Sequence, residues 1–116
     1  MKYLFIINDG PYGNERAYNA LRLAMAIQKR EDAEVSISLV GDGVVNAINN
    51  QKTPDGYYNM GSMLKSVIVK KGKVKVWGSC MDARGLSIDM LIKGADRSSM
   101  LELAEMTEDT DKLLIF

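Results

Sequence analysis

Tyr3-Leu4-Phe5-Ile6-Ile7 is an uninterrupted apolar run near the amino terminus of this chain of 116 residues. Such runs are typical of strands buried on both faces of a parallel sheet, because a solvated face would require alternating polar residues. The run therefore predicts a strand over residues 2–8, which ends at the turn residues Asp9-Gly10-Pro11-Tyr12-Gly13. A strand of this kind needs helices on both sides of its sheet.

Segments with the spacing of helices alternate with segments typical of strands along the rest of the sequence. Apolar residues that recur every three or four positions predict helices over residues 14–29 and 60–69, with shorter helical segments near residues 44–49 and 81–85. Alternating or β-branched apolar residues predict three further strands, over residues 34–40, 73–77 and 110–116.

The carboxyl-terminal part of the sequence is less regular. Residues 88–95 fit neither pattern, so their structure stays ambiguous. Ser99 and Glu102 have the spacing of a capping box, which predicts that a helix begins beside them. Because strands and helices alternate, the sequence predicts an α/β fold, a three-layer α/β/α sandwich with a mainly parallel sheet, in a single domain over residues 1–116.

The composition argues against several classes of function. The 15 Lys and Arg residues balance the 15 Asp and Glu residues, so the chain lacks the basic surplus with which proteins hold nucleic acids or anionic membranes. It has no histidine and one cysteine, which removes Cys-His and Ser-His-Asp catalysis and argues against a transition-metal site. We therefore expect no metal, no cofactor, no nucleic acid and no membrane among its ligands. A net charge of zero also offers little repulsion against self-association.

Cysteine usage and the amino-terminal residues indicate the compartment. One cysteine cannot form a disulfide within the chain, and the apolar run at residues 3–7 is too short for a secretory leader. No apolar segment reaches the length of about 18 residues that a membrane span requires. The sequence therefore predicts a cytoplasmic protein with a reduced thiol.

The only cysteine lies in a distinctive segment, Trp77-Gly78-Ser79-Cys80-Met81-Asp82-Ala83-Arg84-Gly85. This segment directly follows the predicted strand 73–77. The turns that follow parallel strands gather at one edge of the sheet, where open α/β sheets bind their ligands. We therefore expect Cys80 to share an edge with Asp9 and Asp42.

The surroundings of Cys80 bear on its reactivity. Amide groups at the start of a helical turn and the charge of Arg84 would stabilise a thiolate, whereas Asp82 would oppose it if it approached the sulfur. The contrary interpretation is that Cys80 is a small hydrophobic core residue, because free cysteines are among the most buried residue types. Arg84 is correspondingly either an anion partner or a solvated arginine, and Asp9 is more often a turn cap than an acid or base.

The methionines and the aromatic pair Tyr57-Tyr58 also allow two interpretations. Eight methionines are many for a chain of this length, and they either fill the core or form an adaptable contact surface. Tyr57-Tyr58 follows the turn residues Pro54-Asp55-Gly56 and would be unusual as an exposed pair. It could therefore dock a neighbouring subunit.

Several of these segments, taken in order, resemble the DsrE/DsrF-like family of small sulfur-relay and related proteins. The most specific part is the Cys-x-x-x-Arg-Gly pattern that Cys80, Arg84 and Gly85 form within the segment that contains the cysteine. The other parts are the turn Asn8-Asp9-Gly10-Pro11-Tyr12-Gly13 before Glu15-Arg16-Ala17, then Gly94-Ala95, Ser99-Met100 and Leu103-Ala104. The resemblance covers nearly the whole chain, and it implies a parallel five-stranded sheet between helices and assembly into trimers or hexamers.

The resemblance also implies a function. In the better understood relatives, a cysteine at the position of Cys80 accepts sulfur as a persulfide and passes it to a partner protein. By analogy this chain would be a sulfur-relay protein, sulfurtransferase-like if it has an activity, with sulfur donor and acceptor proteins as partners. The residues around the sulfur and its pocket would be Ser79, Asp82, Arg84, Asp9 and Tyr12. The alternative is an oligomeric protein without catalysis that binds a small ligand or a partner, in which Cys80 only lines a pocket.

Overall fold

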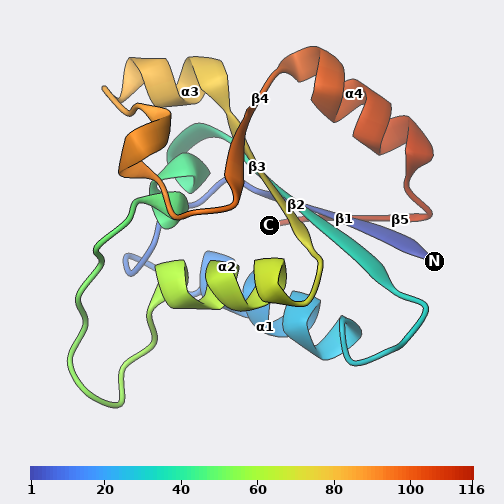
Figure 1. Ribbon diagram of the computed structural model, residues 1–116, viewed down its shortest axis with the longest axis horizontal. Helices are drawn as coiled ribbons and strands as arrows, with labels where there is room; N and C mark the ends of the chain where they lie inside the picture. Colours follow the sequence, from blue (N-terminus) through green and yellow to red (C-terminus); the bar gives the residue numbers. More distant parts are fainter.

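The computed structural model describes all 116 residues. It contains a five-stranded sheet in which every neighbouring pair of strands is parallel, in the order β4-β3-β2-β1-β5 (Figure 1). The strands are β1 (Lys2–Ile7), β2 (Glu34–Leu39), β3 (Lys73–Trp77), β4 (Ala95–Ser98) and β5 (Lys112–Ile115). The α-helices are α1 (Arg16–Ile27), α2 (Met60–Val69), α3 (Gly78–Ala83) and α4 (Met100–Asp109), and two 3₁₀ helices are η1 (Gly41–Ala47) and η2 (Ile88–Met90).

The helices form layers on both sides of the sheet. Helices α1 and α2 lie on one side, and α4 crosses the other side between the edge strands β4 and β5 (Figure 1). The predicted α/β sandwich with five parallel strands is therefore confirmed. None of the helices has the length and apolar character needed to cross a bilayer.

The side of the sheet under α1 and α2 forms the core. One cluster of buried residues joins alternate residues of the three central strands to the inner faces of the two helices. From the strands it takes Phe5, Ile7, Val35, Ile37, Leu39, Val74 and Val76, and from the helices Ala17, Ala20, Leu21, Ala24, Met60, Leu64 and Val67. The small alanines on α1 let that helix approach the sheet closely. The apolar face predicted for the first helix therefore packs on the apolar residues of the first strand.

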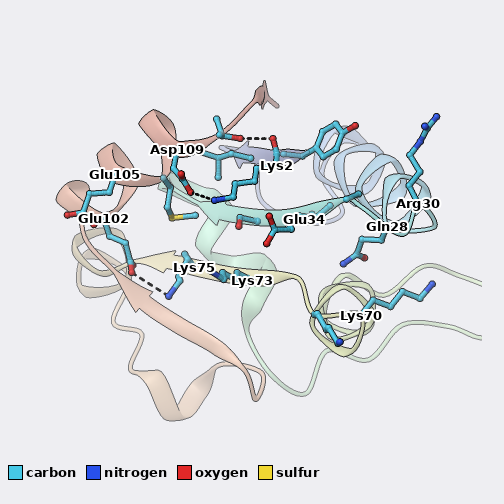
Figure 2. A pocket seen from close by; sticks show the side chains of 18 of the residues that line it. Lys2, Gln28, Arg30, Glu34, Lys70, Lys73, Lys75, Glu102, Glu105 and Asp109 are labelled. Atoms are coloured by element: carbon cyan, nitrogen blue, oxygen red, sulfur yellow. Dashed lines mark hydrogen bonds and ion pairs between the residues drawn. The ribbon is translucent and has the colours of Figure 1, made fainter.

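The side of the sheet under α4 is polar by comparison. No residue of α4 is buried, and ion pairs connect the helix region to the strands: Lys75 to Glu102 at 3.5 Å and Lys2 to Asp109 at 2.8 Å (Figure 2). A cavity of about 810 Å³ opens beside these pairs, lined by residues of β1, β2, β3 and α4 and by the segments that follow α1 and α2. Figure 2 shows that its labelled side chains are mainly charged.

Two elements differ from the sequence predictions near α3. The ambiguous segment contains η2 and leads to the fourth strand, β4, whose residues Asp96 and Arg97 are exposed because it is a short edge strand. Helix α3 begins at Gly78 rather than at Met81. A Cβ on Gly78 would lie 2.6 Å from Cζ of Arg97, so the absence of a side chain there lets the arginine of β4 pack on the start of the helix.

The bounds of one short helix are also shifted. The predicted short helix at residues 44–49 is the 3₁₀ helix η1, which begins earlier, at Gly41. Helix α2 has the predicted bounds, residues 60–69, and Lys71 just after it has the left-handed backbone conformation, with a φ of 71°. Gly72 has no room for a side chain, since a Cβ there would lie 2.5 Å from Cγ1 of Val67.

Candidate functional site

Three turns meet at the carboxyl edge of the parallel strands. Because β1, β2 and β3 run in the same direction, the residues that follow each of them lie at that edge. The turns after β1 and β2 touch, since a Cβ on Gly10 would lie 3.3 Å from the carbonyl oxygen of Asp42. Cys80 follows β3 directly, in the first turn of α3. The structure thus places Asp9, Asp42 and Cys80 at one edge.

The sulfur of Cys80 is half-buried and hydrogen-bonded. The residue packs against the hydrophobic core cluster without being sealed inside it. The backbone N–H of Gly41 donates a hydrogen bond to Sγ, with an N···S distance of 3.2 Å. Gly41 has a φ of 55°, a left-handed conformation that favours glycine. The sulfur of Cys80 thus accepts from a main-chain donor of the turn after β2.

Arg84 contacts the backbone of Cys80 rather than its sulfur. Its Nη1 donates to the carbonyl oxygen of Cys80 at 3.0 Å, while Nη2 and Nε donate to Oδ1 of Asp42 at 2.8 and 3.2 Å. The guanidinium group therefore links α3 to the turn that carries Gly41. The sequence suggested that Arg84 could be a direct partner of the thiolate. In the structure, Arg84 contacts the site through Asp42 and the main chain instead.

Asp82 points to a different partner. Both of its carboxylate oxygens accept hydrogen bonds from Arg97 of β4, at 2.9 and 2.8 Å. The hydrogen bonds from Arg97 hold the pKa of the Asp82 carboxyl below its usual range. The charge of Asp82 is thus paired with Arg97 at the side of α3 that faces β4. Ser79 is exposed, and its hydroxyl makes no hydrogen bond.

Asp9 and Tyr12 belong to a separate network at the same edge. Asp9 forms an ion pair with Arg16 at 3.0 Å, and the Tyr12 hydroxyl donates to the side chain of Gln51 and accepts from the amide of Met60. The Asp9–Arg16 pair holds the turn after β1 to the start of α1, and the Tyr12 contacts hold it to the start of α2. They border the edge on which Cys80 lies, but neither side chain has a hydrogen bond to Cys80, Gly41 or Arg84.

Two buried or half-buried amides organise this edge and were missed from the sequence. Asn46 is fully buried in η1 and donates to the carbonyl oxygens of Asp9 and Gly43, both at 2.9 Å. Gln51 donates to the carbonyls of Asn46 and Ile48 and accepts from Tyr12. Asparagine and glutamine are common surface residues, so only the placement of η1 against β1 reveals these roles.

The tyrosines gather near the same turn. Tyr12, Tyr18, Tyr57 and Tyr58 form a chain of ring contacts, with centroid distances from 4.2 to 6.3 Å. Tyr57 is exposed and Tyr58 is half-buried, and burial raises the pKa of the Tyr58 hydroxyl. The expected exposed pair is therefore one exposed ring stacked on a covered one.

The cavity under α4 is not the site of Cys80. Its lining residues come from the amino-terminal parts of the strands and from α4, and Cys80 is not among them (Figure 2). No group of three or more Cys, Asp or Glu residues is placed to hold a metal ion. The chemistry available at the carboxyl edge is therefore that of one thiol with an amide donor and a nearby ion pair.

Comparisons with known proteins bear on the whole chain. The model of the DsrE/DsrF-like family matches residues 1–116. Protein YchN of Escherichia coli is 35% identical over 116 residues, covering 99% of this chain and 98% of that protein. The uncharacterized protein MJ0989 of Methanocaldococcus jannaschii is 39% identical over 116 residues, and the match covers 100% of this chain and 100% of that protein.

Solved structures agree with the fold. The crystal structure of the E. coli ychN protein superimposes with a TM-score of 0.91 over the full length of both chains. The structure of MTH1491, a protein of unknown function from Methanobacterium thermoautotrophicum, gives a TM-score of 0.73 over 96% of each chain at 14% identity, which supports the fold alone.

Proposed function

Because the chain belongs to the DsrE/DsrF-like family, which is related to sulfur relay, we propose that it carries sulfur as a persulfide on Cys80 and passes it to a partner protein. The observation that carries the proposal is the half-buried residue Cys80, whose Sγ accepts a hydrogen bond from the Gly41 amide at the carboxyl edge of the sheet. Sulfur transfer of this kind requires no histidine and no metal.

The proposed chemistry exchanges one sulfur atom between thiols. The Cys80 thiolate attacks the outer sulfur of a donor persulfide, the donor's S–S bond breaks, and the donor leaves as a thiolate. Cys80 then holds an S–S–H group that keeps the donor's proton. An acceptor thiolate attacks that outer sulfur and the Cys80 thiolate leaves, so neither step needs an oxidant or a reductant.

The surroundings of Cys80 suit a carrier. Partial burial shields the sulfur from water and oxidants, while the amide of Gly41 supports its negative charge before and after each transfer. The chain has no second cysteine that could resolve the persulfide into an internal disulfide. The loaded sulfur therefore waits for a thiol from another protein.

Mass spectrometry tests the proposal. The purified protein is incubated with a cysteine desulfurase and cysteine, and we expect the intact mass to rise by one sulfur atom. The rise should disappear in Cys80→Ser and on addition of a reducing thiol. No gain of sulfur in the folded wild-type protein, under conditions in which the desulfurase is itself loaded, would contradict the proposal.

The proposal includes sulfur donor and acceptor proteins, a cytoplasmic location, and self-association into a trimer or hexamer. Self-association is supported by the large apolar side chains that α4 and β5 leave in solvent, among them Leu101 at 71% and Ile115 at 65% exposure. Analytical ultracentrifugation should give a mass three or six times that of the 12.9 kDa chain. A monomer at every concentration would contradict this part of the proposal.

A further inference from the structure

We propose that Arg84 and Asp42 are positioning residues that hold the Gly41 amide against the sulfur of Cys80, so that the ion pair controls the thiolate indirectly. This inference rests on the proposed function and concerns the same sulfur. It assigns the pair a role that the charge of Arg84 alone would not give it. The ion pair between Arg84 and Asp42 joins two separate segments of the chain, the turn after β2 and the helix after β3.

The geometry closes a small ring of contacts. Arg84 donates from Nη1 to the carbonyl oxygen of Cys80 at 3.0 Å. It also donates from Nη2 and Nε to the carboxylate of Asp42, at 2.8 and 3.2 Å. Asp42 is adjacent to Gly41, whose amide returns to the sulfur of Cys80 at 3.2 Å. The guanidinium and the amide thus fix both ends of the contact between the two segments.

The other side of the turn is already fixed by the backbone. A Cβ on Gly43 would lie 2.1 Å from the carbonyl oxygen of Ile7, so the turn lies directly on the end of β1 there. At Asp42 the chain is exposed, and the side-chain contact recorded there is the pair with Arg84. Backbone hydrogen bonds from Val40 to Ile7 and from Gly43 to Val40 hold the turn to β1. The ion pair is the side-chain contact that joins the turn to α3, so we expect it to adjust where the Gly41 amide lies relative to that helix.

Positioning and a direct charge effect predict opposite results. If the charge of Arg84 acted directly on the sulfur, removal of the Asp42 carboxylate would leave more positive charge near the thiolate and favour it. If the pair positions Gly41, removal of the acceptor oxygens of Asp42, as in Asp42→Ala, frees the turn and weakens the amide contact, which disfavours the thiolate. The sign of the Asp42 effect therefore separates the two mechanisms.

The test uses the rate of alkylation of the folded protein by iodoacetamide between about pH 6 and pH 9, together with the NMR signal of the Cys80 Cβ. Cys80 is the only cysteine, so both signals come from one thiol. The variants are Asp42→Ala, Asp42→Asn, Arg84→Ala and Arg84→Lys, each checked for folding by circular dichroism. Asparagine keeps an acceptor oxygen without the charge, whereas lysine keeps the charge without the planar fork that reaches two acceptors.

We expect Asp42→Ala, Arg84→Ala and Arg84→Lys to shift the alkylation profile to higher pH and to slow alkylation at neutral pH by about tenfold, the effect of losing one hydrogen bond to a charged group. Asp42→Asn should stay close to the wild-type profile. The matched control is Arg16→Ala, which removes an exposed arginine paired with Asp9 at the same edge and leaves the ring of contacts intact. It should leave the profile unchanged.

An unchanged profile or a shift to lower pH in Asp42→Ala would overturn the inference, as would a wild-type profile in Arg84→Lys. The amide signal of Gly41 adds a direct readout, since it should move in Asp42→Ala and not in Asp42→Asn. Because alkylation and NMR require no sulfur donor, they test the positioning role even if Cys80 takes up no sulfur. Failure of persulfide loading and failure of this inference can therefore be told apart.

Discussion

The two sides of the sheet are built on different principles. Under α1 and α2, the strands present residues such as Phe5, Ile37 and Leu39, whose side chains are fully buried. Under α4, the strands present Lys75 among other polar residues, and no residue of the helix is buried. One side is a close-packed core, and the other is a polar layer connected by ion pairs beside a cavity (Figure 2).

The difference indicates where the free energy of folding comes from. Burial of apolar surface stabilises the side of α1 and α2, whereas exposed ion pairs contribute little on the side of α4. The apolar side chains that α4 leaves in solvent are then available for contact with another chain. Four measurements test this difference between the two sides of the sheet.

The largest effect is expected in the core. Ile37 lies at the centre of β2, between β1 and β3, and its side chain is fully buried. Ile37→Ala should lower the free energy of unfolding by about 2–5 kcal/mol, because the removed methyl groups leave a cavity in a packed layer. Urea denaturation measures this loss. A loss below about 1 kcal/mol would contradict close packing around Ile37 on this side of the sheet.

The next effect concerns the end of the core at η1. Gly43→Ala places a methyl group 2.1 Å from the carbonyl oxygen of Ile7, and neither backbone can yield easily. We expect a loss of about 1–3 kcal/mol in the free energy of unfolding. Gly13→Ala is the control, since a Cβ there meets nothing within 4 Å. Equal stability of the two variants would show that the close contact at Gly43 relaxes without cost.

A smaller effect is expected in acid, on the side of α4. The neighbouring Ser98 side chain and the charge of Lys75 hold the pKa of Glu102 below its usual range. A carboxyl whose pKa is depressed in the folded state stabilises the fold above its unfolded pKa and loses that contribution as the pH falls through its folded pKa. Melting temperatures measured from neutral pH to below about pH 4 should therefore fall less steeply in Glu102→Gln than in the wild type. Parallel curves for the two proteins would contradict this.

The smallest effect is expected at the surface of α4. Leu101 is 71% exposed, so Leu101→Ala should change the free energy of unfolding by no more than about 0.5 kcal/mol in a dilute sample. If another copy of the chain covers this side, the destabilisation should grow with protein concentration, because association is linked to folding. A large loss in dilute solution would show that Leu101 is packed within the single chain.

The sequence was sufficient where the signal is local. The apolar run at residues 3–7, the helix at residues 60–69 and the strand at residues 73–77 carry their periodicity in their own residues, and the structure has these elements. The placement of Cys80 at the carboxyl edge also followed from the order of strands and helices. Helix α4 begins where the capping pair predicts, with the Ser99 hydroxyl accepting from the Glu102 amide at 3.2 Å.

The sequence was insufficient where a partner is distant. Strand β4 has the charged residues Asp96 and Arg97 at its centre, because an edge strand needs no apolar face toward solvent. The partner of Arg84 lies 42 positions earlier in the chain and the partner of Asp82 lies 15 positions later. No local pattern fixes such pairs, so the contact of Arg84 with the Cys80 carbonyl rather than with the sulfur required the tertiary structure.

Helix α4 joins the two edges of the sheet along the chain. Strands β4 and β5 follow one another in the chain, yet they lie at opposite ends of the strand order and are joined by α4 (Figure 1). If the segment opens as one cooperative unit, both edges lose protection from amide hydrogen exchange together, while β1, β2 and β3 stay closed beneath α1 and α2. The same event withdraws Arg97 from Asp82 and removes one of the ion pairs that hold α3, while the contacts of α3 with Gly41 and Asp42 stay in place. The Arg97–Asp82 contact would then have the same opening free energy as the outermost strand on the far edge, β5.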